Sequence, residues 1–194
     1  LPGRPFPTWR PSLDAVAGRT DPIKLQLTGP ITLGLALVDA GVAPQLAFAV
    51  SSGAVAARAR DLVALSEARA PGVARVVVFD EPGLVGGLRM DLPLPADQVV
   101  DVLSGALAAI EDGALTGVHV CGPADWRLIM QAGPGVLSMP LGADVTGSAG
   151  ALGSFLERGG WVAWGAVPTD GPLGEHNSRY WRQLSAQWCE LVQN

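Results

Sequence analysis

The chain has 194 residues, 48% of them apolar and 16% charged, and it carries a net charge of −5. This composition predicts one soluble globular domain over residues 1–194, and the acidic balance with scattered basic residues excludes a nucleic-acid partner. Two cysteines give no disulfide framework, and no stretch reaches the ~20 uninterrupted apolar residues of a membrane span. We therefore expect a cytoplasmic protein without a membrane partner.

Prolines at positions 2, 5, 7 and 11 predict an extended, proline-rich N-terminal segment over residues 1–20. Beyond it, apolar runs of strand length alternate with helical patterns. The predicted elements in chain order are a strand at 23–28, helices at 31–38 and 45–70, a strand at 75–79, a helix at 96–111, a strand at 115–121, a helix at 124–131, a strand at 136–141, a helix at 148–158, a strand at 161–167 and a helix at 175–192.

This alternation predicts parallel strands joined by right-handed crossovers, and hence an α/β fold. No predicted strand leads into a Gly-x-Gly-x-x-Gly turn, so a dinucleotide-binding fold would lack its phosphate loop. Polar and reactive side chains instead fall at the carboxyl ends of successive strands, which meet at one mouth in a (β/α)8 barrel of TIM type. They are Thr28, Asp80, Glu81, His119, Cys121 and Ser138. Because five strands cannot close an eight-stranded barrel, we expect an incomplete TIM barrel, either a fragment or a shortened form.

His119 and Cys121 are the most informative of these residues. They lie two positions apart in an apolar run, and side chains two apart on a strand point to the same face. A thiolate beside an imidazole is a typical zinc ligand pair. The alternative is a histidine and a cysteine that simply pack in the sheet, since free cysteine commonly behaves as a small core residue.

Four segments then carry a family resemblance: QLTGPITL at 26–33, FDEPGL at 79–84, HVCG at 119–122 and WGAVP at 164–168. Their order resembles that in the barrel superfamily of cobalamin-independent methionine synthase, the corrinoid-dependent thiol methyltransferases and uroporphyrinogen decarboxylase. The resemblance spans about residues 20–170.

For the methionine synthase branch, the resemblance implies a zinc ion bound by His119 and Cys121, which would activate a substrate thiol as thiolate. It also implies that Asp80 holds the amino group of homocysteine, and we expect Glu81 and Thr28 beside it in the substrate site. The alternative for the acidic pair is that Asp80 caps the following turn while Glu81 is solvated.

The chain departs from that family pattern in several places. Pro140 stands where the family has a zinc-binding glutamate, and Gly86 replaces an acid that contacts the folate donor. The family's last cysteine ligand follows the final helix, whereas this chain ends at Asn194, and Cys189 is expected to be a packed core thiol. The missing folate contact favours a corrinoid as methyl donor.

The preferred interpretation is a methyltransferase of methionine biosynthesis that moves a methyl group to a zinc-activated small thiol, homocysteine or a similar compound. One alternative is a uroporphyrinogen decarboxylase-like enzyme, and another is a non-catalytic or truncated barrel relative without metal. Because an incomplete barrel leaves a sheet edge to be covered, we also expect a homodimer.

Overall fold

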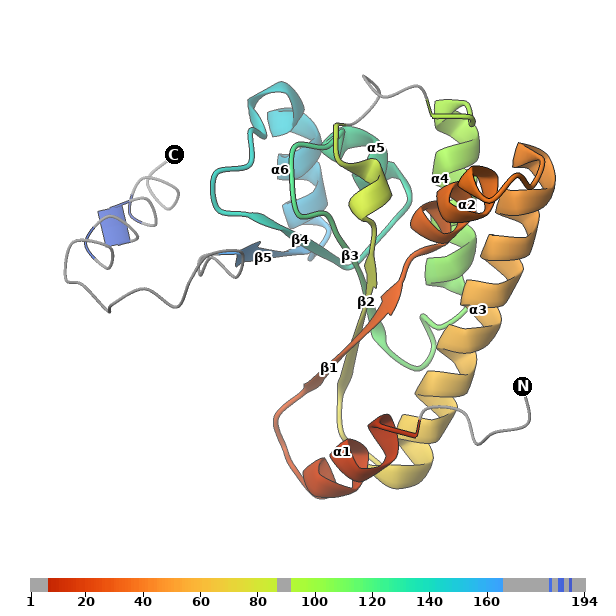
Figure 1. The fold of residues 1–194 in the computed structure, drawn as a ribbon. Coiled ribbons are helices and arrows are strands. Elements are labelled where there is room, and N and C mark those ends of the chain that lie inside the picture. The colour runs from red at the N-terminus through yellow and green to blue at the C-terminus, as the bar shows by residue number, and fades with distance from the viewer. Residues whose placement is uncertain (1–6, 87–91, 166–181, 183–184, 187–188, 190–194) are drawn as a thin grey trace.

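The computed structural model describes residues 7–86, 92–165, 182, 185, 186 and 189 (Figure 1). The strands are β1 (Ile23–Thr28), β2 (Arg75–Asp80), β3 (Leu115–His119), β4 (Val136–Pro140) and β5 (Trp161–Gly165). The helices are α1 (Trp9–Val16), α2 (Pro30–Asp39), α3 (Pro44–Arg69), α4 (Ala96–Ala108), α5 (Trp126–Gln131) and α6 (Ala149–Glu157). The fold is therefore α/β, as the alternation of patterns predicted.

The five strands form one parallel sheet in the order β1-β2-β3-β4-β5, so neighbours in the sequence are neighbours in the sheet. Strands added one after another at the same edge place successive crossovers on the same side of the sheet. Figure 1 shows α2, α3 and α4 stacked together beside β1 and β2. The order has no switch point at which the direction of addition reverses, unlike that of a doubly wound sheet.

Local sequence explains where the helices begin. Pro30 and Pro44 occupy the first turns of α2 and α3, where a missing amide hydrogen costs nothing. The side chain of Asp125 caps α5 by accepting a hydrogen bond from the Leu128 amide at 3.0 Å. These helices bury one face each, and Phe48, Leu62 and Leu103 are among the side chains that build the core between helices and sheet.

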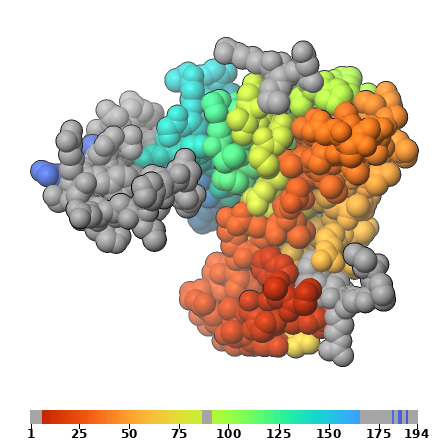
Figure 2. All heavy atoms as spheres, viewed as in Figure 1, coloured from red at the N-terminus to blue at the C-terminus, as the bar shows by residue number. Residues whose placement is uncertain are grey.

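The extended segment expected over residues 1–20 is wrong for residues 9–16, which form α1. Pro11 lies in the first turn of that helix and therefore removes no hydrogen bond. Leu13 is buried, and Asp14 forms an ion pair with Arg69 at the end of α3, with a closest distance of 2.9 Å. In Figures 1 and 2, α1 lies against this end of α3, beyond the amino ends of the strands.

The remaining predicted elements differ from the structure only at their ends. The helix expected at 96–111 ends at Ala108, and the helix expected from residue 124 begins at Trp126. Of the helix predicted at 175–192, residues 182, 185, 186 and 189 are described, and these are helical. The rest of that helix and the last two residues of the strand predicted at 161–167 lie outside the described residues. Within the part of the chain that the structure describes, no helix has both the length and the apolar character needed to span a bilayer.

Candidate functional site

Four polar side chains form a row across the carboxyl ends of the first four strands. Thr28 pairs with Asp80, Asp80 with His119, and His119 with Ser138 in the register of the sheet. Register partners on adjacent parallel strands point to the same face. We call these four residues the polar row.

The polar row lies on the face of the sheet that the helices do not cover. On β2, β3 and β4, the residue that precedes the member of the polar row points to the opposite face of the sheet. All three of these residues are fully buried against the helices. They are Phe79, Val118 and Leu137. Thr28 is exposed, and the other three members of the row are half-buried. The expectation that reactive side chains gather at one end of the sheet is met for these four residues.

Asp80 has a partner that the sequence analysis did not select. The side-chain amide of Gln26 donates a hydrogen bond from Nε2 to Oδ1 of Asp80 at 2.7 Å. Gln26 lies two residues before Thr28 on β1 and so shares its face. Among the described residues, Oδ2 of Asp80 has no hydrogen-bond partner, which leaves that oxygen available to a cationic ligand.

His119 and Ser138 are hydrogen-bonded to each other, with 3.0 Å between Nδ1 and Oγ. Their backbones are also fixed. The carbonyl of His119 accepts from the Glu81 amide at 2.8 Å, and the carbonyl of Ser138 accepts from the Val120 amide at 3.1 Å. The imidazole is therefore held on one side, through Nδ1, while Nε2 makes no hydrogen bond to a described residue.

Cys121 follows β3 and is an exposed free thiol. Burial alternates along this stretch, because Val120 is fully buried while His119 and Cys121 on either side of it are accessible. That alternation agrees with the expected placement of the histidine and the cysteine on one face. Within the described residues, no group of three or more His, Cys, Asp or Glu side chains is arranged to hold a metal ion. The zinc site stays a prediction that rests on two donors.

Glu81 points away from the polar row, into the helix layer. Its side chain is 0% exposed, and Oε1 accepts a hydrogen bond from the Ile31 amide at 2.9 Å. Oε2 accepts from both the amide and the hydroxyl of Thr32, each at 2.7 Å. These amides belong to the first turn of α2, where backbone N–H groups have no acceptor within the helix. Glu81, 50 residues further along the chain, accepts their hydrogen bonds. Both oxygens are occupied by the fold itself.

The environment of Glu81 shifts its ionisation. Burial raises the pKa of Glu81 to about 7, although the hydrogen bonds from Thr32 and Ile31 lower it in part. The negative charge of the neighbouring Asp80 adds to the rise. The two adjacent carboxyl groups therefore have different surroundings: Asp80 faces the accessible side of the sheet, and Glu81 is buried on the other.

Small residues around Glu81 make room for it. A Cβ atom on Gly29 would overlap Oε1 of Glu81, so any larger residue there would force the buried Glu81 side chain to move. The Thr32 hydroxyl also accepts a hydrogen bond from the Gly83 amide at 3.0 Å. The two sequence motifs at 26–33 and 79–84 are thus joined through one buried carboxyl group, and we call Gly29, Ile31, Thr32, Glu81 and Gly83 the Glu81 interlock.

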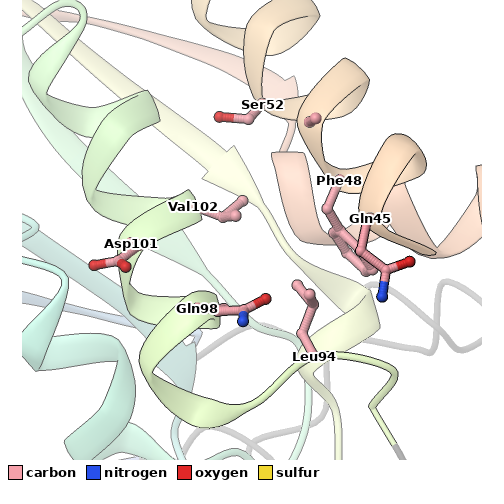
Figure 3. A pocket seen from close by; sticks show the side chains of 8 residues that line it. Gln45, Phe48, Ser52, Leu94, Gln98, Asp101 and Val102 are labelled. Atoms are coloured by element: carbon pink, nitrogen blue, oxygen red, sulfur yellow. The ribbon is translucent and has the colours of Figure 1, made fainter.

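A hollow on the described surface lies away from these residues. A groove of about 380 Å³ lies between α3 and α4 (Figure 3). Phe48 and Gln45 of α3 line one wall, Gln98 and Val102 of α4 line the other, and Leu94 lies at its end. No predicted site residue borders this groove, so it is separate from the polar row.

The positions at which the chain departs from the family pattern are also described. Pro140 ends β4 and offers no side-chain donor to a metal. Gly86 has a φ of +96°, a conformation that favours glycine, and its amide bonds the Pro123 carbonyl at 2.6 Å. Cys189 is exposed, so its expected role as a packed core thiol is wrong.

Comparison with known proteins gives no relative: no protein-family model matches the chain, and no curated protein matches it significantly. The resemblance to the methionine synthase superfamily therefore stays a prediction based on the four motifs. The sheet order, the polar row and the Glu81 interlock do not depend on it.

Proposed function

We propose that the chain is a methionine synthase-like methyltransferase, and that the polar row with Cys121 binds a small thiol substrate. The observation that carries this proposal is the register of β2 and β3. It places Asp80 directly opposite His119, on the accessible face and at the carboxyl end of the sheet. A carboxylate, an imidazole and, two residues on, a thiol are thereby available to one small ligand.

The proposed architecture is an incomplete (β/α)8 barrel. Sequential parallel order with the helices on one side is the arrangement of strands in such a barrel. The accessible face also carries large apolar side chains near the amino ends of the strands, where Trp161 is 68% exposed and Leu115 is 43% exposed. Further strands, or a second copy of the chain in a homodimer, would cover this face.

The donor chemistry of the pair fits zinc. An imidazole nitrogen and a thiolate are preferred ligands of this ion, and the pair leaves coordination positions for a substrate sulfur and a further donor. His119 and Cys121 would hold the ion. When bound there, zinc would lower the pKa of a coordinated thiol and keep it as thiolate.

The other residues of the row bind and orient the substrate. Asp80, held by Gln26, would pair with the ammonium group of an amino thiol through its free Oδ2. Thr28 adds a hydroxyl next to it in the register. With the thiol proton already lost, the sulfur would attack the methyl carbon of the donor. A carbon–sulfur bond would form, the bond between the methyl carbon and the donor would break, and its electron pair would stay with the donor. Gly86 in place of an acidic folate contact favours a corrinoid as that donor.

Pro140 favours a second candidate, a barrel relative that binds a small ligand at the polar row but does not use a metal. This position ends β4 beside the row, and its side chain cannot ligate. A uroporphyrinogen decarboxylase-like activity has less support, because a tetrapyrrole with many carboxylates needs arginines, and the polar row contains none.

Metal content separates the two candidates. Protein purified without chelator should contain about one zinc per chain by elemental analysis, and His119→Ala and Cys121→Ala should each lose it. Cys189→Ala is the matched control, because it removes an exposed thiol outside the site and should retain the metal. Formation of methionine from homocysteine and methylcobalamin then tests the reaction. Protein without zinc would refute the metal-dependent mechanism and leave the second candidate.

A further inference from the structure

We infer that β5 is the docking edge for a second copy of the chain. Two β5 strands would pair antiparallel about Ala163 and join two five-stranded sheets into one continuous sheet. The inference assigns the expected homodimer to one edge and one register. It depends on backbone contacts and not on the proposed methyl transfer.

The two edges of the described sheet differ in chemistry. β1 and β5 are its end strands (Figure 1). β1 carries the exposed Lys24, and a lysine on an edge strand discourages pairing with another chain. β5 contains no charged residue and no proline, and Trp161 is 68% exposed. Even Val162 and Trp164, which point toward the helix side, are only half-buried. An apolar edge of this kind is prone to pair with a further strand.

The outward hydrogen-bonding groups of β5 belong to Val162 and Trp164. The Trp161 amide donates at 2.9 Å to the residue before β4, and the Gly165 carbonyl accepts at 3.4 Å from the residue after it. Along a strand, the N–H and C=O groups of successive residues point to alternate sides. The groups of Val162 and Trp164 therefore face away from β4, and no strand of the described residues lies on that side.

These groups determine the register of the pair. With Ala163 at the centre, Val162 of one copy lies opposite Trp164 of the other. Two residues that face each other in this way exchange two hydrogen bonds, so the dimer gains four. A centre at Val162 would set Trp164 against Gly160, whose amide already donates to the Phe155 carbonyl at 3.0 Å. The described hydrogen bonds therefore favour the centre at Ala163.

The side chains fit the same register. Trp161 of one copy lies opposite Gly165 of the other on the open face of the sheet, and an aromatic side chain that covers a cross-strand glycine stabilises the pair. At the centre two small Ala163 side chains meet, where Cα atoms approach to about 4.5 Å. Because the strand matches itself in hydrogen bonds and in side-chain size, we commit to a second copy as the partner.

The pairing also aligns the two candidate sites. Ala163 is the register partner of Ser138, so the polar rows of both copies fall in one line on the same face of the joined sheet. The two Ser138 residues are then three strand spacings apart, about 14 Å.

Sedimentation of the full chain tests the interface. Five residues a side are few compared with the ~20–30 of a standard interface, so we expect a reversible dimer with a Kd on the order of 10 µM. Val162→Pro removes an outward N–H, leaves the bonds to β4 intact, and should leave the protein monomeric up to about 300 µM.

Lys24→Pro is the matched control at the opposite edge. The Ile23 amide donates toward β2 at 2.9 Å, so the N–H of Lys24 also points outward, and this variant should still dimerise. Circular dichroism checks that both variants fold. A protein that is monomeric at every concentration, or a dimer that survives Val162→Pro, would overturn the inference.

Disulfide cross-linking tests the register independently. Ala163→Cys is made together with Cys121→Ser and Cys189→Ser, because both native thiols are exposed. Facing residues at the centre meet the Cα separation of ~4.4–6.8 Å that a disulfide needs, so mild oxidation should give a covalent dimer. Val162→Cys in the same background should not cross-link, since its counterpart is offset along the strand. Cross-linking through position 162 but not 163 would overturn the register. Neither readout involves a metal or a methyl donor, so failure here leaves the proposed function standing.

Discussion

The buried carboxyl group of Glu81 is expected to make the fold less stable as pH rises through the neutral range. Its pKa is raised from the ordinary value of 4.5 to about 7 in the folded chain. Between these values the folded protein keeps a proton that the unfolded chain has released, so raising the pH favours unfolding. The contribution of protonated Glu81 is therefore fully present below about pH 4.5 and is lost as the pH passes 7.

The size of this effect follows from the shift. A difference of about 2.5 pKa units, at ~1.4 kcal/mol per unit, corresponds to about 3 kcal/mol between pH 4.5 and pH 8. For a urea m-value of about 2–3 kcal/mol/M, the midpoint of unfolding should fall by about 1 M. Other ionisable groups also change over this range, so a comparison with a variant is needed.

Glu81→Gln provides that comparison, because it keeps the shape of the side chain and cannot ionise. The amide still accepts from α2 through one oxygen but places its NH2 group against a donor, which adds a cost that does not depend on pH. Urea unfolding followed by circular dichroism at pH 5, 6, 7 and 8 should show the wild type losing its advantage over the variant as the pH rises. Glu157→Gln removes an exposed carboxylate and should follow the wild type. A stability difference between wild type and Glu81→Gln that is constant with pH would refute the reasoning.

Three further substitutions test the interlock, a helix cap and the polar row. Gly29→Ala should destabilise the fold by about 2–3 kcal/mol in urea unfolding, because the new methyl group overlaps the buried Glu81 carboxylate; a neutral result would mean that the interlock yields easily. Asp125→Ala removes the cap of α5 and should cost about 1 kcal/mol in the same assay, and an unchanged midpoint would contradict that role. Gln26→Leu should weaken calorimetric binding of homocysteine about 3- to 10-fold while leaving an analogue without the amino group unaffected, and equal losses for both would argue against orientation of Asp80.

The sheet could be predicted well from the sequence, because all five predicted strands begin at the residues where the structure begins them. Short apolar or alternating runs in the sequence mark these starts. The ends of the strands could be predicted less well than their starts. A strand stops where its hydrogen bonding to the neighbouring strand stops, and not where the apolar residues end. The strand predicted to Cys121, for example, ends at His119, its last residue paired with β4. The helix α1 was missed because its packing on α3 outweighs a local excess of proline.

The polar row could also be predicted, since a period of two fixes which strand residues share a face. The same rule should have separated Glu81 from Asp80, because adjacent residues at the end of a strand point to opposite sides. The hydrogen bond from Gln26 to Asp80 could not be predicted in this way. It depends on the exact register between β1 and β2, and a shift of that register by two residues would keep every side chain on the same face.

The Glu81 interlock also bears on the order in which the chain folds. The first turn of α2 finds its acceptors only 50 residues further along, after the whole of α3 has been made. In a growing chain that emerges from the ribosome, the first amides of α2 therefore stay exposed to water until β2 follows. β1, α2 and α3 cannot pack into their final arrangement before then. We expect segments that end before Glu81 to remain open to proteases, and the arrival of this one residue to coincide with the first stable docking of helices on the sheet.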